Sequence, residues 1–308
     1  MSLGPLDETP VSGRRREAPL ITFGLPAYQR PALLREALAS LAAQSGGYDY
    51  EVIVCDDGGL AETVRVVREF SADRVAFYAN RPALGAVGNW NRCLQHARGR
   101  WVMILHEDDT LYPWYLDTVV PRLRAGLSAV CTQVVQGATP PVLPPPARGT
   151  AVRPYPPRCF LKGSFTPFPG VLFPRELGLR LGGFDPRWGP LADYDFWYRL
   201  AASGPVEVVR TIGAFYRVSE GQWTDSEWRR MLRLAHLIRL RVAREQLGAS
   251  PRLGRWLARF FTARTAQANA KRYLERPAGL TRALALGRIP LSAPPSGWVW
   301  QLVKLLAR

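Results

Sequence analysis

Mostly apolar runs of strand length alternate with segments of helical periodicity over the first third of the chain. The runs, each followed closely by Pro, Asp or Asn, are residues 20–25, 50–55, 74–78 and 100–105. Continuous apolar runs of this kind are typical of strands buried on both faces of a parallel sheet. After the first run, Leu34, Leu38 and Leu41 form one apolar stripe, which predicts a helix that ends before Gly46. The alternation predicts an α/β fold, with a mostly parallel sheet and helices on both faces.

Two of these runs end in clusters of carboxylates, Asp56-Asp57 after the second and Glu107-Asp108-Asp109 after the fourth. Unpaired carboxylates are costly to bury and neighbouring ones repel each other, so both clusters are expected where side chains meet water, a cation or a ligand. Because parallel strands share one carboxyl edge, the clusters should border one crevice, where open α/β sheets bind ligands. Oxygen ligands of this type suit Mg²⁺ or Mn²⁺. The alternative is a solvated loop, or an N-cap for the next helix.

The third run leads into a glycine-containing loop, residues 80–89, which opens a helix that ends near Ala97. No GxGxxG follows a predicted strand and no GxxxxGK[ST] occurs, so the usual dinucleotide and P-loop phosphate sites are absent from the sequence. A cation is then the expected counter-charge for a bound diphosphate.

The pattern changes character in the middle of the chain. After Leu111 it predicts a helix that extends to about Leu123, and then a strand at 129–135. Residues 139–157 hold eight prolines, which excludes the interior of a sheet and predicts a long surface loop. Such a loop is either a lid or binding loop, or a disordered insertion.

A further helix is predicted after the turn at 182–185, because Phe196 and Leu200 suit one inner face. Asp193 and Asp195 lie in or just before its first turn, where the helix dipole favours anions. Two interpretations of Asp193 are open, an N-cap or a general base in a cleft. The spacing alone favours the cap.

The net charge of +16 is concentrated at the carboxyl-terminal end of the chain. Residues 226–308 contain 15 Arg and two Lys against three Glu, a net charge of +14. Apolar residues recur there at helical spacing, and Arg252, Arg255 and Arg259 fall opposite one such stripe, which predicts amphipathic helices. Either these helices pack on the protein and their arginines are solvated, or the arginines bind anionic lipid headgroups or an acidic acceptor. The terminal segment 298–306 could lie in a membrane interface, or pack on the protein or on a second subunit.

Composition narrows the class of protein. The chain is 47% hydrophobic, which argues against wholesale disorder. Its four cysteines are far apart without a CxxC pair, so reduced core residues are expected, not a zinc site or disulfide framework. Residues 1–18 are expected to form a flexible arm that is not a signal peptide, and no apolar run is long enough to predict a membrane-spanning helix.

Several short motifs come in a recognisable order along the chain. They are Pro26-Ala27-Tyr28-Gln29-Arg30, Val54-Cys55-Asp56-Asp57-Gly58, Asn80 with Gly85 and Asn89, Leu105-His106-Glu107-Asp108-Asp109, Gly182-Gly183-Phe184-Asp185, Asp193-Tyr194-Asp195-Phe196-Trp197 and Tyr216-Arg217-Val218. Each is weak alone, but together, over roughly residues 19–220, they resemble glycosyltransferase family 2 with the GT-A fold.

The resemblance implies an inverting transfer from a nucleotide-sugar donor, for which a UDP-sugar is expected, with Mg²⁺ or Mn²⁺. It implies that the metal is held by Asp109 and Asp108, with Asp108 also near the ribose, and that Asp193 is the general base. Supporting roles fall to His106, Glu107, Asp195 and Arg217. The implied nucleotide-binding residues are Pro26, Ala27, Tyr28, Arg30, Asp56, Asp57, Asn80, Gly85, Asn89 and Asp108.

Three positions depart from the family pattern. The family often has Asp where this chain has His106, an acidic residue at Ala192, and His at Ser219. We expect His106 to be neither a metal ligand nor essential, while Ser219 puts metal dependence in doubt. The processive signature Gln-x-x-Arg-Trp is missing, which predicts addition of one sugar at a time.

The predicted organisation is a catalytic domain at 19–220 and a basic helical region at 221–308. The protein is expected in the cytoplasm, in solution or on the inner face of the membrane, as a monomer or homodimer. The acceptor would be a cell-envelope polysaccharide, a lipid-linked sugar or a small molecule. Alternatives are a nucleotidyltransferase-type enzyme that releases pyrophosphate and a nucleotide-binding member that has lost catalysis. A nucleic-acid-binding protein is less favoured, because the basic region lacks a recognisable motif.

Overall fold

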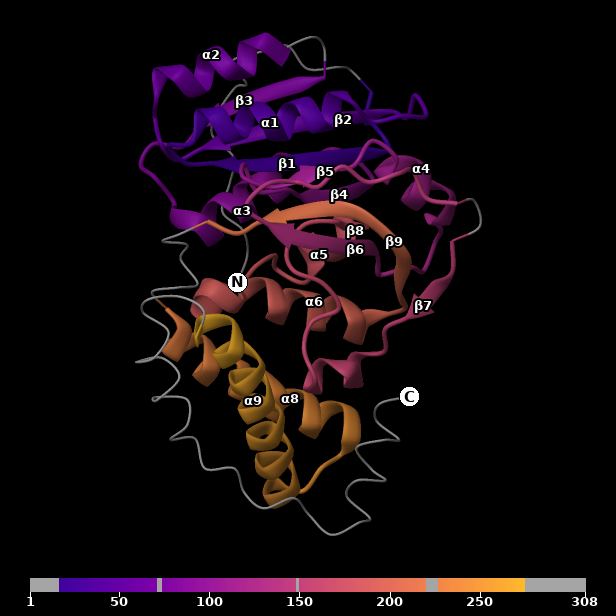
Figure 1. The fold of residues 1–308 in the computed structure, drawn as a ribbon, viewed down its shortest axis with the longest axis vertical. Helices are drawn as coiled ribbons and strands as arrows, with labels where there is room; N and C mark the ends of the chain where they lie inside the picture. Colours follow the sequence, from indigo (N-terminus) through magenta and orange to yellow (C-terminus); the bar gives the residue numbers. More distant parts are fainter. Residues whose placement is uncertain (1–16, 71–73, 148–149, 220–226, 275–308) are drawn as a thin grey trace. The chain divides into compact units, whose positions relative to one another are not determined.

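A computed structural model describes residues 17–70, 74–147, 150–219 and 227–274, which form two compact units (Figure 1). The first unit contains the described residues up to Tyr155 and those from Thr166 to 219, and the second contains 156–165 and 227–274. The predictions for the amino-terminal arm, for Gln222 and for the terminal segment 298–306 fall almost wholly outside the described residues.

The first four strands form the parallel half of a sheet in the first unit. They are β1 (Ile21–Ala27), β2 (Tyr50–Asp56), β3 (Val75–Ala79) and β4 (Trp101–Ile104), arranged in the order β3-β2-β1-β4. Every strand predicted from the first third of the sequence is therefore confirmed. Their carboxyl ends share one edge, so the two acidic clusters follow neighbouring parts of that edge.

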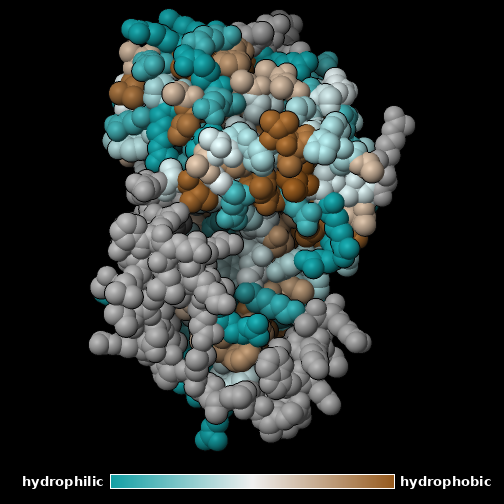
Figure 2. All heavy atoms as spheres, in the orientation of Figure 1, coloured by the Kyte–Doolittle hydropathy of each residue, from teal (hydrophilic) through white to brown (hydrophobic). Residues whose placement is uncertain are grey.

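Helices cover both faces of this parallel half, as predicted (Figure 1). They are α1 (Pro31–Ala42), α2 (Ala61–Phe70) and α3 (Gly85–His96). Alternate residues of a strand face opposite sides, and Phe23 packs in one apolar core with Leu34 and Leu38 of α1. On the other side α3 lies against Gly24, where an added Cβ would stand 2.6 Å from Cβ of Cys93. The outer surface of α2 is charged and hydrophilic (Figure 2).

The second half of the sheet is mixed. β8 (Val171–Pro174) pairs antiparallel with β4 and with β6 (Ala129–Gly137), β6 pairs parallel with β9 (Val206–Arg217), and β5 (Thr110–Leu111) closes the order antiparallel to β9. The strand at 129–135 is thus confirmed, and β5 is an element that the sequence did not reveal. The helices of this half are α4 (Tyr115–Val119), α5 (Arg175–Arg180) and α6 (Ala192–Ser203).

The prediction of a proline-rich loop over residues 139–157 is wrong for three residues, which form a strand. β7 (Val152–Pro154) pairs antiparallel with β9, and Pro154 is tolerated because β7 is an edge strand. The predicted helix after Leu111 is also shorter than expected, since α4 passes into a 3₁₀ turn at Val120–Arg122 that contains Pro121.

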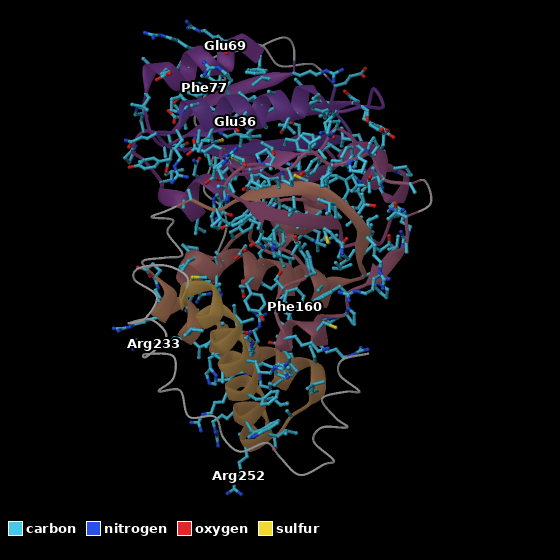
Figure 3. The ribbon with its side chains drawn as sticks, in the orientation of Figure 1. Glu36, Glu69, Phe77, Phe160, Arg233 and Arg252 are labelled. Atoms are coloured by element: carbon cyan, nitrogen blue, oxygen red, sulfur yellow. The ribbon has the colours of Figure 1, made fainter. Side chains whose placement is uncertain are left out.

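The second unit consists of α8 (Trp228–Leu247), α9 (Pro251–Leu274) and a 3₁₀ segment at Pro157–Leu161. The helices are amphipathic as predicted. Ile238 and Val242 of α8 and Leu257 of α9 are buried, and Arg252 points away from the helices (Figure 3). Sequence periodicity did not assign the 3₁₀ segment to this unit, where it packs on α8 and its Phe160 is buried.

Arg239 of α8 is buried, unlike the exposed arginines that the pattern predicted. Arg239 is only 1% exposed. Its guanidinium donates hydrogen bonds to the carbonyl oxygen of Leu161 at 2.9 Å, to Oγ1 of Thr262 at 3.0 Å and to Oγ1 of Thr265 at 2.6 Å. Arg239 therefore ties the 3₁₀ segment to both helices.

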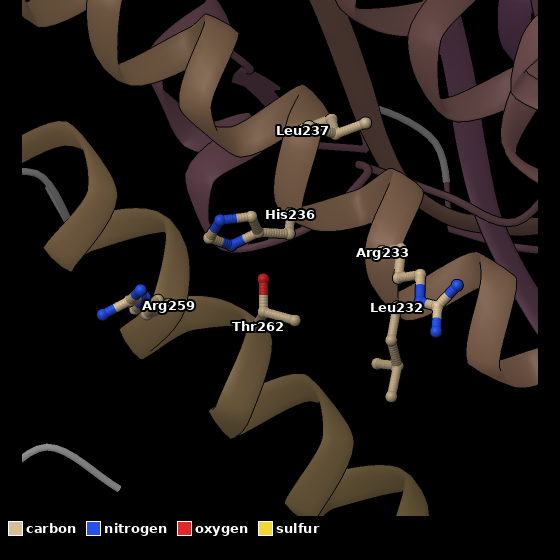
Figure 4. Close-up of a pocket in the computed structure, with 6 residues that line it drawn as sticks. All are labelled: Leu232, Arg233, His236, Leu237, Arg259 and Thr262. Carbon is tan, nitrogen blue, oxygen red and sulfur yellow. The ribbon is translucent and has the colours of Figure 1, made fainter. Parts of the chain in front are cut away.

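A hollow of about 420 Å³ lies on the second unit, with an almost wholly apolar surface (Figure 4). His236 of α8 and Thr262 of α9 point toward each other across it. The lining residues are Leu232, Arg233, His236, Leu237, Arg259 and Thr262. No helix in the described residues is both long and apolar enough to cross a bilayer.

Candidate active site

The turn after β1 is fastened to the acidic loop after β4. The backbone N–H of Tyr28 donates to Oε2 of Glu107 at 2.9 Å, and Nη1 of Arg30 lies 2.8 Å from Oδ2 of Asp108. The Tyr28 side chain is exposed, whereas Pro26 and Ala27 are the last residues of β1 and are buried. These contacts leave an exposed aromatic ring and a guanidinium at the carboxyl edge of the parallel strands, where the sequence predicted a crevice.

A buried polar network fixes the ends of the first strands. Oδ1 of Asp57 accepts from Nδ2 of Asn80 at 2.6 Å, and Oδ2 accepts from the N–H of Leu84 at 3.1 Å. Asn80 also donates to Oδ1 of Asn89 at 2.9 Å, and Asn89 donates to the carbonyl oxygens of Cys55 at 2.9 Å and Ala27 at 3.3 Å. The network therefore joins β1, β2 and the residue after β3 to α3.

Asp56 is engaged by its own turn. Its two carboxylate oxygens accept the backbone N–H groups of Gly58 at 3.0 Å and Gly59 at 2.8 Å. Gly85, with a φ of 72°, begins α3 in open space. The hydrogen bonds hold Asp56, Asp57, Asn80 and Asn89 at the carboxyl ends of the first strands, and their contact with a nucleoside stays a prediction.

Asp109 is the most deeply buried carboxylate of the acidic loop, with 0% exposure. Its Oδ1 accepts the backbone N–H of Arg217 at 3.0 Å, while its buried Oδ2 makes no hydrogen bond within the described part of the chain. Burial, followed by the charge of Asp108, raises the pKa of Asp109 well above its usual range. A buried carboxylate oxygen without a donor is a position that a cation would satisfy.

Arg217 clamps the acidic loop from β9. Besides its backbone contact, its Nε donates to the carbonyl oxygen of Asp108 at 3.0 Å and its Nη1 to that of Ala138 at 2.9 Å. Its Nη2 pairs with Glu36 of α1, which is labelled in Figure 3. Glu36 was not predicted, because an acidic residue on an exposed helix face carries no sequence signal for this contact.

His106 lies beside the two aspartates, in an aromatic setting. Its ring centroid is 4.0 Å from that of Phe168 and 5.2 Å from that of Trp90. Burial lowers the pKa of His106 to about 4, so the imidazole is neutral at pH 7. One ligand atom from each of His106, Asp108 and Asp109 lies within 4.8 Å of the others, and this donor set fits a divalent cation.

Glu107 is buried on the other side of the loop and is 7% exposed. Burial raises its pKa to about 7, against the hydrogen bond from Tyr28, which lowers it. This carboxyl group joins the loop to the turn after β1.

Asp193 does not cap α6, so the favoured interpretation of its position is wrong. The N-cap residue is Leu191, and Asp193 lies inside the first turn, where its Oδ1 accepts the backbone N–H of Tyr194 at 2.7 Å. Burial raises the pKa of Asp193 to about 6. Trp197, one helical turn later on the same face, has its ring 5.7 Å from that of Phe168, which packs on His106. That face of α6 is therefore directed toward the acidic loop.

Asp195 has a structural partner. Its Oδ2 accepts from Nε of Arg199 at 2.7 Å, and Arg199 also donates to the carbonyl oxygens of Leu181 at 2.8 Å and Gly183 at 2.7 Å. Asp195 thereby orients an arginine that holds the glycine turn. Arg199 was missed in the sequence, since its spacing of four from Asp195 also describes an ordinary helix-surface ion pair.

Comparison with known proteins identifies the family of this chain. Residues 22–173 match the model described as Glycosyl transferase family 2. An uncharacterized protein of Mycobacterium tuberculosis is 28% identical over 234 residues, which are 64% of this chain and 66% of that protein. A UDP-Glc:alpha-D-GlcNAc-diphosphoundecaprenol beta-1,3-glucosyltransferase of Escherichia coli is 32% identical over 90 residues, 29% of this chain and 35% of that one. The matches thus span about one third to two thirds of these relatives.

Solved structures share the fold. TarS of Staphylococcus aureus, residues 1–349 in complex with UDP-GlcNAc, superimposes with a TM-score of 0.59 at 17% identity over 79% of this chain and 70% of that one. The mannosyltransferase PcManGT of Pyrobaculum calidifontis, in complex with GDP-Man and Mn²⁺, gives a TM-score of 0.54 at 20% identity over 99% and 83%. The match to the family model shows that the chain belongs to glycosyltransferase family 2, and the solved structures, together with the strand order described above, show that it has the GT-A fold.

Proposed function

We propose that this chain is an inverting, non-processive glycosyltransferase that moves a sugar from a nucleoside-diphosphate sugar to an acceptor hydroxyl. The observation that carries the proposal is the buried Oδ2 of Asp109, which has no hydrogen-bond partner among the described residues and lies beside Asp108 and His106 at the carboxyl edge of the parallel strands. This is where open α/β sheets bind ligands. The family match and the nucleotide-sugar complexes of the structural neighbours support the choice of donor.

The acidic loop would hold a divalent cation, Mg²⁺ or Mn²⁺, through Asp109 and Asp108. When bound, the cation supplies charge neutralisation for the departing nucleoside diphosphate. The Arg217 clamp positions the carboxylates, because it fixes the backbone at Asp108 and one oxygen of Asp109. Arg30, which pairs with Asp108, would meet a phosphate oxygen.

The nucleoside would lie along the turn after β1, with Tyr28 as an exposed ring and Asp57 at the end of β2. A UDP-sugar is the proposed donor, on the support of the UDP-GlcNAc complex of TarS and the UDP-Glc-dependent relative. Asp193 would take the proton from the acceptor hydroxyl. With a pKa raised to about 6, its carboxylate is mostly ionised at pH 7 and is a stronger base than an ordinary Asp.

A lipid-linked sugar is the proposed acceptor class, on the support of relatives named for undecaprenol-linked substrates. The exposed arginines of α8 and α9, with the apolar hollow bordered by Arg233 and Arg259, support a peripheral position on an anionic membrane, with the protein in the cytoplasm.

Calorimetric titration with UDP, GDP, dTDP and CDP tests the proposal, each with Mn²⁺ and then with EDTA. Tight binding of one diphosphate that EDTA abolishes is the expected result, and it names the donor class. Absence of binding to all four would overturn the proposed function and leave the family assignment in place.

A further inference from the structure

We propose that His106 is itself a ligand of the cation, through a ring nitrogen, and that this nitrogen makes the site favour Mn²⁺ and Co²⁺ over Mg²⁺. The inference rests on the proposed function, since it concerns the cation of the same site. It reverses the sequence-based expectation that His106 is not a ligand, and it concerns the position where the family often has Asp.

The first argument is distance. One ligand atom from each of His106, Asp108 and Asp109 lies within 4.8 Å of the other two. Ligands on opposite sides of an octahedral ion stand about 4.2 Å apart, because each metal–oxygen bond is about 2.1 Å. A small rotation of these side chains therefore gathers all three atoms into one coordination shell.

The second argument is the condition of the neighbouring carboxylate. Asp109 is 0% exposed and its Oδ2 makes no hydrogen bond in the described residues, so this oxygen lacks both water and a donor. Nε2 of His106 is likewise buried without a hydrogen bond there. Unsatisfied polar atoms of two adjacent side chains are costly unless a further group enters the site.

The third argument is the way in which the imidazole is held. Phe168 and Trp90 pack on the same side of the imidazole, since their own centroids are 4.7 Å apart, and they lie 4.0 and 5.2 Å from the His106 centroid at interplanar angles of 33° and 27°. Contact with two neighbouring aromatic rings restricts the rotation of the imidazole. A side chain held this way gives up little rotational freedom when it coordinates a metal.

Ligand type then determines the preference for a metal. Mg²⁺ is held through oxygen and retains several waters, whereas imidazole nitrogen suits first-row transition metals. A site of two carboxylates and one imidazole therefore discriminates against Mg²⁺ more than a site of three carboxylates.

Pulsed EPR of Mn²⁺ bound to the full chain with UDP tests the contact directly. The expected result is a ¹⁴N coupling to the ion that becomes a ¹⁵N coupling when the protein is labelled with ¹⁵N-histidine, which separates imidazole from nucleotide nitrogen. Bound Mn²⁺ without a histidine coupling would overturn the inference but leave the proposed function standing. Failure of Mn²⁺ to bind at all would overturn both. This measurement needs no substitution.

His106→Asp tests the preference, with affinities for Mn²⁺ and Mg²⁺ measured by calorimetry in the presence of UDP. The expected result is a fall of about tenfold in the ratio of the two affinities, toward Mg²⁺. His236→Asp in the second unit is the matched control and should leave the ratio unchanged. A ratio that is the same in His106→Asp and in the unchanged chain would contradict the inference.

Discussion

The backbone N–H of Arg217 donates a 3.0 Å hydrogen bond to Oδ1 of Asp109, so the end of β9 fixes one oxygen of this carboxylate, while the other has no donor in the part of the chain that the structure describes. The two residues are 108 positions apart in the chain. One carboxylate oxygen thus accepts a structural hydrogen bond, and the other is available to a cation. A single substitution can separate these two roles.

Asp109→Asn keeps Oδ1 for the Arg217 N–H and replaces Oδ2 by an amide nitrogen, which repels a cation. We expect the cation-dependent affinity for UDP to fall by at least about 100-fold, while the melting temperature is unchanged or rises, because a buried carboxylate is removed. Calorimetry and thermal unfolding measure these two quantities. Asp117→Asn, the same substitution at an exposed position of α4, is the control. Retained Mn²⁺-dependent binding would show that Asp109 does not hold the ion.

Asp193→Asn should lower the transfer rate by at least about 100-fold, the usual contribution of a general base. The affinity for UDP should stay the same, because the substitution is in α6 and leaves the acidic loop intact. In the unchanged chain the rate should rise with pH through about 6, where Asp193 ionises. An active Asn variant would move the base elsewhere, with Asp195 the next candidate.

Glu107 should make the protein less stable as the pH rises. Its folded pKa of about 7 lies above the ordinary 4.5, so the folded state binds the proton more tightly between these values and loses that advantage as the pH increases through 7. Glu107→Gln should reduce this loss by up to about 3 kcal/mol. Urea unfolding at pH 5 and pH 8 measures it, with the exposed Glu62→Gln as control. An equal loss in both variants would refute the assignment.

Asn89→Ala removes the side chain that links Asn80 to the carbonyl oxygens of Cys55 and Ala27. We expect a loss of about 2–3 kcal/mol in the free energy of unfolding, since these buried groups lose their partners, and weaker UDP binding. Gln136→Ala, at an exposed position of β6, should stay within about 0.5 kcal/mol of the unchanged chain. Chemical denaturation measures the free energy of unfolding of both variants. Equal values would show that the network does not stabilise the fold.

Arg233 and Arg259 border the apolar hollow of the second unit, and their replacement by Gln should weaken binding to anionic vesicles about 30-fold, at about 1 kcal/mol for each arginine near the surface. Sedimentation with phosphatidylglycerol vesicles at several salt concentrations measures this. Arg65→Gln with Arg68→Gln on α2 removes the same charge elsewhere and should have no effect. An equal loss of vesicle binding in both double variants would show that the hollow has no specific role in membrane binding.

The regular elements of the first unit were predictable from local pattern. The runs that became β1, β2 and β4 are apolar because they are buried on both faces, and Pro31 and the leucine stripe of α1 are signals within one short segment. β5 and β7 were missed because two or three residues hold no periodicity. Pro154 even argues against a strand, unless its edge position is known.

The location of candidate site residues was predictable where a strand end concentrates them, as at Asp56-Asp57 and Asp108-Asp109. The polar side chains that hold the site were not, since their partners are far away in the sequence. Asn91 of α3, whose amide bonds both the N–H and the carbonyl of Phe184, resembles any helix-surface residue in the sequence. Arg239 looks like any other arginine of the basic region in the sequence, and its burial follows from its partners in distant segments, Leu161, Thr262 and Thr265.

The second unit draws its 3₁₀ segment from the middle of the chain, so no single cut divides this protein into its two parts. A chain ended at residue 222 would keep Phe160 and Leu161, which are at most 1% exposed, but lose α8, on which their segment packs. Two side chains of this size would then face water within the remaining polypeptide. The first unit therefore cannot be separated from the basic helices by removing the end of the chain. Proteins truncated before α8 are expected to aggregate, even where every residue of the candidate site is present.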